Sequence, residues 1–129
     1  MKGIQLSNRS EKPFYQQLHE QISAQILRGE LAADFALPPI RTAAAELRVS
    51  IITVKKAWEE LERAGLIYSV TGRGCFVADL ASGGRENRRE EILKQRLERD
   101  REFYLGMGVD KKEMIRLVEK YYQADSQIR

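Results

Sequence analysis

The residues of this chain that could do chemistry are basic and hydroxyl side chains between positions 41 and 73. Arg41, Lys55 and Arg73 can donate hydrogen bonds to phosphate oxygens or base edges, and arginine can donate two in parallel. Ser50 and Thr53 would add hydroxyl groups at the start of a helix, where free backbone N–H groups also attract phosphate. This chemistry is typical of a surface that binds nucleic acid.

Groups for catalysis or metal binding are few. The chain has one histidine, His19, and one cysteine, Cys75, so it lacks a metal-binding Cys–His spacing and cannot form an internal disulfide. Gly72-Arg73-Gly74 is too short to be a phosphate-binding loop. We therefore expect no enzyme, no metal and no cofactor. Cys75 is expected to fill space in a strand, with an exposed thiolate as the alternative.

Length and composition limit the class of protein. The chain has 129 residues, of which 43% are hydrophobic and 32% charged, and its formal net charge is +3. These values fit a small helix-rich globular domain with an appendage, and the charge is weak evidence for an anionic partner. No apolar run approaches the ~20 residues of a membrane span and no signal peptide is present, so a cytoplasmic protein is expected.

Helical spacing predicts three helices before residue 66. The first opens at Pro13 and ends at Gly29, the second runs from about 39 to 47, and the third follows Ser50 as its N-cap and ends at Gly65. The predicted buried faces are Tyr15, Leu18, Ile22 and Ile26, then Ile40, Ala43, Ala44 and Leu47, then Val54, Ala57, Trp58 and Leu61.

A hairpin follows the third helix. Strand-like segments at 66–70 and 75–78 flank Thr71-Gly72-Arg73-Gly74, where glycine permits a tight turn. Helix, turn, helix and hairpin in this order predict a winged helix-turn-helix, which lays its recognition helix in the major groove of DNA. Arg73 would then enter the minor groove or hold a phosphate; a solvated turn is the alternative. A further edge strand is expected at Ile4-Gln5-Leu6.

The front of the third helix carries an unusual apolar pair. Ile52 is expected to face the groove, where isoleucine can pack on a thymine methyl group, whereas Ile51 is expected to lie mostly in the core. Lys55 is preferred over Lys56 as a DNA contact, the alternative being that both are solvated charges. The full set assigned to DNA is Arg41, Ser50, Ile52, Thr53, Lys55, Lys56, Thr71, Gly72 and Arg73.

A second unit is expected after Ala81-Ser82-Gly83-Gly84, which changes the composition and divides the chain into domains 1–79 and 80–129. A charged helix over about 85–105 precedes a last helix that starts at Asp110. Their apolar residues have no core of their own, so this region is expected to form a homodimer. The assigned dimer residues are Ile92, Leu93, Leu97, Phe103, Tyr104, Met114, Leu117, Val118, Tyr121 and Tyr122.

The motifs over residues 4–78 resemble the GntR family of bacterial transcription regulators. The tail is too short for the effector-binding domains of most members and is similar to that of the YtrA-type subfamily, whose tail mediates dimerisation. Pro39, Arg48 and Ile51-Ile52 depart from the family pattern. The matching segments are Pro13-Phe14-Tyr15-Gln16-Gln17-Leu18, Gly29-Glu30-Leu31, Leu37-Pro38-Pro39-Ile40-Arg41, Ala45-Glu46-Leu47, Thr53-Val54-Lys55-Lys56-Ala57, Leu61-Glu62-Arg63-Ala64-Gly65-Leu66-Ile67 and Gly72-Arg73-Gly74-Cys75-Phe76-Val77.

The resemblance implies a mostly α fold with a small β wing: a winged helix-turn-helix domain followed by a short α-helical dimerisation tail. It implies a homodimeric repressor that binds a pseudo-palindromic double-stranded operator through a recognition helix at about 50–64 and a wing at about 66–78. It also implies that Arg41 contacts DNA rather than pairing with Glu46. No small-molecule effector is assigned. The alternative is a winged-helix adaptor that binds proteins and not DNA.

Overall fold

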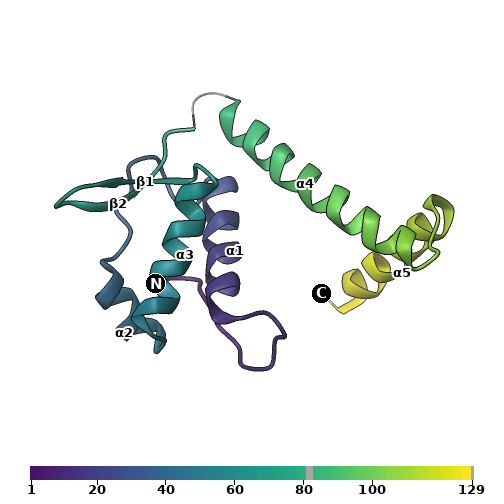
Figure 1. Cartoon of the computed structure of the whole chain (residues 1–129), viewed down its shortest axis with the longest axis horizontal. Helices are drawn as coiled ribbons and strands as arrows, with labels where there is room; N and C mark the ends of the chain where they lie inside the picture. Colours follow the sequence, from purple (N-terminus) through teal and green to yellow (C-terminus); the bar gives the residue numbers. More distant parts are fainter. Residues whose placement is uncertain (81–82, 129) are drawn as a thin grey trace. The chain divides into compact units, whose positions relative to one another are not determined.

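The computed structural model describes residues 1–80 and 83–128, with side chains described as far as residue 123. Contacts divide the chain into a first unit, Met1–Asn87, and a second unit, Arg88–Arg129. Part of the predicted boundary, residues 81–82, lies outside the described residues. The elements are α1 (Phe14–Leu27), α2 (Ile40–Leu47), α3 (Ile51–Arg63), β1 (Ile67–Val70), β2 (Gly74–Val77), α4 (Gly84–Gly106) and α5 (Lys111–Ile128) (Figure 1).

The core of the first unit lies around α3. Helices α1 and α2 both pack against α3, and β1 packs at its far end. The apolar stripe predicted for α3 is confirmed, because all four of its members are buried, including Trp58. The predicted stripes of α1 and α2 are confirmed at their centres, while Tyr15, Ile40 and Leu47 are half-buried at the edges. The buried apolar side chains are Ile4, Leu18, Ile22, Ile26, Leu37, Ala43, Ala44, Val54, Ala57, Trp58, Leu61, Leu66, Ile67 and Val77.

Four helices end in the same hydrogen-bond pattern, the Schellman motif, which needs a residue with a left-handed backbone just after the helix. Glycine occupies that place after α1, α3 and α4, with Gly29, Gly65 and Gly108 at φ of 80°, 74° and 81°. After α2 the residue is Arg48, at φ 56°. The N–H groups of Arg48 and Val49 donate to the carbonyls of Ala45 (3.4 Å) and Ala44 (3.1 Å). The turn of the helix-turn-helix is therefore built with an arginine in a strained conformation.

The wing is a two-stranded antiparallel sheet in which Ile67 lies opposite Val77 and Val70 opposite Gly74. The segment before α2 also pairs with β2, through an isolated bridge between Ala36 and Phe76. Here Val77 N–H donates to the carbonyl of Phe35 (2.9 Å), and Leu37 N–H donates to that of Cys75 (2.9 Å). These hydrogen bonds connect the base of the wing to the segment that leads into α2.

The predicted strand at residues 4–6 is wrong, because this segment has no strand partner. A side chain of α1 takes the place of a strand. The backbone N–H of Gln5 donates to Gln21 Oε1 (2.9 Å), and Gln21 Nε2 donates to the Gln5 carbonyl (2.7 Å). Ile4 is buried, which accounts for the alternating pattern that suggested a strand.

Gln21 is the middle of three glutamines spaced four residues apart on α1, which we call the glutamine ladder (Gln17, Gln21 and Gln25). Gln17 exchanges hydrogen bonds with the backbone of Ser7, accepting at 2.8 Å and donating at 3.0 Å. Gln25 Nε2 donates to the carbonyl of Lys2 (3.0 Å). Residues four apart share one helix face, so the ladder holds the extended N-terminal segment along α1.

The second unit is a pair of helices without buried side chains among its described residues. The predicted cap of α5 is confirmed, since Asp110 Oδ1 accepts a hydrogen bond from Glu113 N–H (2.9 Å). The predicted break at 106–108 is confirmed by the end of α4 at Gly106. A helical pair that buries no side chain of its own has little to stabilise it as a monomer.

Candidate nucleic-acid interface

The front of α3 is organised by Ser50. Its Oγ accepts a hydrogen bond from Thr53 N–H (3.0 Å), as predicted for an N-cap, and lies 2.8 Å from Thr53 Oγ1. The prediction for Ile51 is wrong, because this side chain is 43% exposed rather than buried. Ile51 is the first residue of α3, ahead of the turn at which Val54 enters the core, so its side chain is only partly covered. Ile52 is 77% exposed, as expected of a groove-facing residue.

Arg41 and Lys55 are exposed cations with no acidic partner among residues 1–80 and 83–123. Arg41 lies in the first turn of α2, and Lys55 in the second turn of α3. The predicted alternative for Arg41 was an ion pair with Glu46. Glu46 instead accepts from the N-terminal ammonium of Met1 (2.9 Å), which leaves the Arg41 guanidinium free to meet an anion.

Lys56 differs from Lys55 in its surroundings. Its Nζ lies 4.0 Å from the centre of the Tyr15 ring, so the lysine spans from α3 to α1. This cation–π contact is a structural use of the charge that the sequence analysis missed. Its only sequence signal is an aromatic residue at the edge of the buried face of α1. Of the two lysines, Lys55 is the one without such a partner, which agrees with the preference stated above.

The tip of the wing projects its backbone and one cation into solvent. Gly72 has φ 78°, which permits the tight turn, and Arg73 N–H donates to the Val70 carbonyl (2.9 Å). Thr71 and Arg73 are exposed, and the described residues contain no acid paired with Arg73. A Cβ at position 72 would meet no atom within 4 Å, so glycine is favoured here by the positive φ and not by a lack of space.

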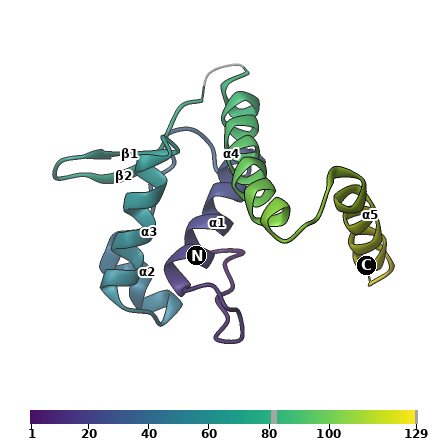
Figure 2. The same ribbon diagram turned by 45° about the vertical axis from the view of Figure 1, so that its right-hand side comes forward.

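These groups come from three elements on one part of the first unit. In both views, α2, α3 and the wing lie to the left of α1, with the wing and α2 toward opposite ends of α3 (Figure 2). The exposed groups described above lie on α2, the front of α3 and the wing tip, and Met1 of the N-terminal segment pairs with Glu46 on the same α2 (2.9 Å). The exposed residues there combine cations, hydroxyls and an apolar tip, and such a surface can bind phosphate and read base edges.

Other groups offer less chemistry. His19 is half-buried, and burial lowers its pKa while Glu60 and Glu20 partly oppose that effect. Cys75 is neither fully buried nor fully exposed, and its Sγ lies 3.4 Å from Ser69 Oγ. The described residues contain no cluster of metal-binding side chains. No helix in the described part of the chain is long and apolar enough to cross a membrane.

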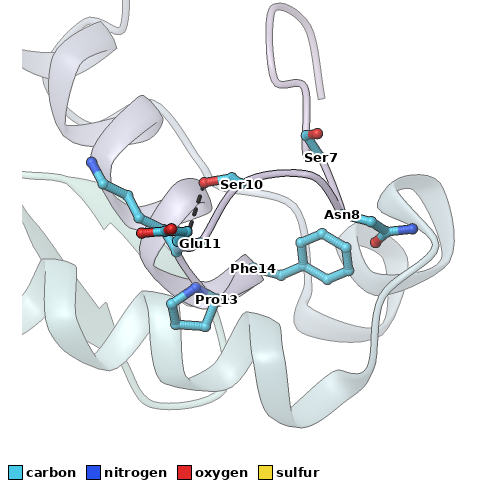
Figure 3. Close-up of a pocket in the computed structure, with 7 residues that line it drawn as sticks. Ser7, Asn8, Ser10, Glu11, Pro13 and Phe14 are labelled. Atoms are coloured by element: carbon cyan, nitrogen blue, oxygen red, sulfur yellow. Dashed lines mark hydrogen bonds between the residues drawn. The ribbon is translucent and has the colours of Figure 1, made fainter.

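One shallow hollow lies at the loop before α1 (Figure 3). Its polar groups serve the loop itself, since Ser10 Oγ accepts a hydrogen bond from Lys12 N–H (3.1 Å). Lys12 also pairs with Glu20 (2.8 Å). The hollow holds neither a histidine nor a cysteine, and its lining residues are Ser7, Asn8, Ser10, Glu11, Lys12, Pro13 and Phe14.

Comparison with known proteins identifies the family. The family model of bacterial regulatory proteins of the gntR family matches residues 14–77, which run from α1 to β2. The transcriptional repressor YtrA of Bacillus subtilis strain 168 is 32% identical over 94 residues, which cover 73% of this chain and 72% of YtrA. The chain belongs to the GntR family. The predicted resemblance to its YtrA-type members is confirmed as well.

Other GntR relatives match over different shares of their length. The repressor NagR of the same organism is 39% identical over 75 residues, which cover 58% of this chain but only 31% of NagR. A GntR family transcriptional regulator from Listeria monocytogenes has a TM-score of 0.65 at 29% identity, covering 89% of this chain and 98% of the other. The DNA-binding domain of AraR in complex with operator ORX1 matches with a TM-score of 0.51 at 37% identity, over 57% of this chain and 92% of that one.

Proposed function

We propose that this GntR-family chain is a homodimeric transcription repressor that binds a pseudo-palindromic DNA operator. The carrying observation is that α2, α3 and the wing tip each present an exposed cation, Arg41, Lys55 and Arg73, that has no acidic partner in the described part of the chain. The relatives support this reading, because YtrA and NagR are transcriptional repressors and the AraR domain is seen with an operator. Nothing among them supports the adaptor alternative.

In this proposal each element has a role. Helix α3 lies in the major groove, with Ser50 and Thr53 near a phosphate at its N-terminus and Ile52 at the bases. Arg41 and Lys55 hold phosphates or guanine edges on either side. The wing tip approaches the adjacent minor groove at residues 71–73, where Arg73 meets the negative potential. Lys56 contributes less, because its ammonium is held over Tyr15.

Dimerisation through the second unit is the other half of the proposal. The contact residues assigned on α4 fall within an arc of about 140° at 100° per residue, with Leu105 outside it, and those on α5 do the same, with Ile115 just outside. Most are exposed, as in Leu97 at 66% and Phe103 at 63%. A second copy would bury them. The proposed contact residues are Ile92, Leu93, Leu97, Phe103, Tyr104, Met114, Leu117, Val118, Tyr121 and Tyr122.

In this proposal the protein acts by binding DNA and not by catalysis. It would lie in the cytoplasm with the chromosome, because its proposed partner is DNA. A selection from a random double-stranded DNA pool tests it. We expect the full chain to enrich sites with two inverted half-sites about one helical turn apart, as two recognition helices of a two-fold dimer would bind. Failure to enrich any sequence would contradict the proposal.

The dimer half has its own test. Leu97→Glu would place a charge on the exposed apolar arc of α4, whereas Gln95→Glu changes the charge of an exposed polar residue nearby. Light scattering at micromolar concentration should show a dimer for the native chain and for Gln95→Glu, and a monomer for Leu97→Glu. A monomeric native chain would contradict the proposal directly.

A further inference from the structure

The front of α3 carries apolar surface that nothing in the first unit covers. Ile51 and Ile52 are its first two residues, 43% and 77% exposed. β-branched residues lower helix propensity, and aliphatic surface left in water is unfavourable. Neither the stability of the helix nor the solubility of the protein accounts for two such residues side by side.

The surroundings of this pair favour DNA over an apolar protein partner. The cap residue Ser50 and Thr53 are polar neighbours, the exposed cation Lys55 lies one turn further along α3, and Arg41 is exposed on α2. The helix N-terminus adds partial positive charge of its own. An apolar pair flanked by cations is complementary to a surface that is anionic overall but presents apolar groups at defined positions, as DNA does.

We propose that Ile51 and Ile52 are specificity-determining residues that recognise thymine through its C5-methyl group. The inference rests on the proposed function, since it assigns the base class read by the same α3 interface. In the major groove the thymine methyl is the apolar group that a base pair presents, and isoleucine can neither donate nor accept a hydrogen bond. The restricted χ1 of isoleucine in a helix fixes where its methyl groups lie.

A consequence follows for the operator. Each half-site should contain at least one T·A pair beneath the first turn of α3. Burying one methyl group is worth about 0.8 kcal/mol, which is roughly a fourfold change in affinity at 1.4 kcal/mol per tenfold. Recognition by Ile51 and Ile52 should therefore depend on the methyl itself and not on the hydrogen-bonding groups of the T·A pair.

The experiment uses the full chain and the DNA site enriched from the random pool. Each thymine of one half-site, and its symmetry mate, is replaced in turn by deoxyuridine, which lacks only the methyl. At one or two positions, the affinity of the native chain should fall roughly fourfold for each methyl removed. At all other positions the replacement should leave the affinity nearly unchanged. Ile52→Ala should bind the thymine site more weakly and lose the difference between thymine and uracil at its position.

Two further variants keep the test sharp. Ile52→Val retains a β-branched apolar side chain and should keep most of the methyl preference, and Ile51→Ala should lose the preference at the neighbouring position. Circular dichroism should show all variants folded, because both side chains are exposed. The inference would be overturned if the preference for the methyl group survived in both Ile52→Ala and Ile51→Ala. It would also be overturned if the native chain bound its site tightly but showed no such preference; either result would leave DNA binding intact. Absence of any enriched site would overturn the proposed function and this inference together.

Discussion

The ammonium of Lys56 on α3 lies 4.0 Å above the centre of the Tyr15 ring on α1. The two neighbouring lysines of α3 therefore have different roles: Lys56 joins two helices, and Lys55 is left for an anion. We expect Lys56→Gln to lower the free energy of unfolding by about 0.5–1 kcal/mol, the size of an exposed cation–π contact. Lys55→Gln should leave stability unchanged and weaken DNA binding. Urea unfolding of both variants measures the difference in stability, and Tyr15→Phe is the control that keeps an aromatic ring under Lys56. Equal losses of stability at both lysines would contradict the different roles assigned to them.

The glutamine ladder should control the N-terminal segment. Gln21→Ala removes both hydrogen bonds to the Gln5 backbone, and each such bond contributes about 0.5–1.5 kcal/mol. We expect faster proteolysis within the first ten residues and faster amide exchange at Gln5. Gln16→Ala is the matched control, because the Gln16 side chain donates a hydrogen bond to Glu20 on its own helix (3.2 Å) and, within the described residues, none to the N-terminal segment. Equal protection of the segment in both variants would argue against the ladder.

Arg48 stands where three other helices of this chain have glycine. Relief of its left-handed backbone, at φ 56°, is worth about 1–2 kcal/mol, and part of this is offset by the greater freedom of glycine in the unfolded chain. Arg48→Gly should therefore raise the free energy of unfolding by about 0.5–1 kcal/mol. Ala64→Gly, at the C-cap of α3 with φ −77°, should lower it instead. A destabilised Arg48→Gly would show that the arginine side chain stabilises the turn.

His19 should make stability depend on pH. Burial lowers the pKa of His19 in the folded chain below its ordinary value of about 6.5, so the unfolded chain binds more protons between the two values. The neutral imidazole contributes stability that is present above pH 6.5 and lost as the pH falls through the folded pKa. His19→Gln should flatten the decline in unfolding free energy between pH 7.5 and 5.5. An unchanged decline in the variant would assign the effect to other groups.

Much of the first unit could be predicted from sequence because local signals agreed with the packing. The period of Val54, Ala57, Trp58 and Leu61 marked the buried face of α3, and Ser50 marked its start. These features depend on residues within a few positions of each other. Helix existence, caps and the hairpin turn all belong to this class.

What the sequence did not reveal depends on residues far apart in the chain. The N-terminal segment looked like a strand because Ile4 is buried, but its backbone partners are glutamine side chains of α1. Ile51 was misplaced because helical spacing gives its direction on α3 without telling where the core ends. The contact of Lys56 with Tyr15 likewise joins two helices, and no spacing within either one encodes it.

The most direct test of the DNA-binding face is the salt dependence of operator affinity in single-charge variants. Each phosphate contact releases counterions and contributes about 0.9 to the slope of log affinity against log salt. Arg41→Gln, Lys55→Gln and Arg73→Gln should each bind more weakly, and those that lose a phosphate contact should have a slope smaller by about 0.9. Lys12→Gln, which removes an exposed charge paired with Glu20 away from the face, should match the native chain. Native affinity and native slope in all three variants would contradict the assignment of this face to DNA.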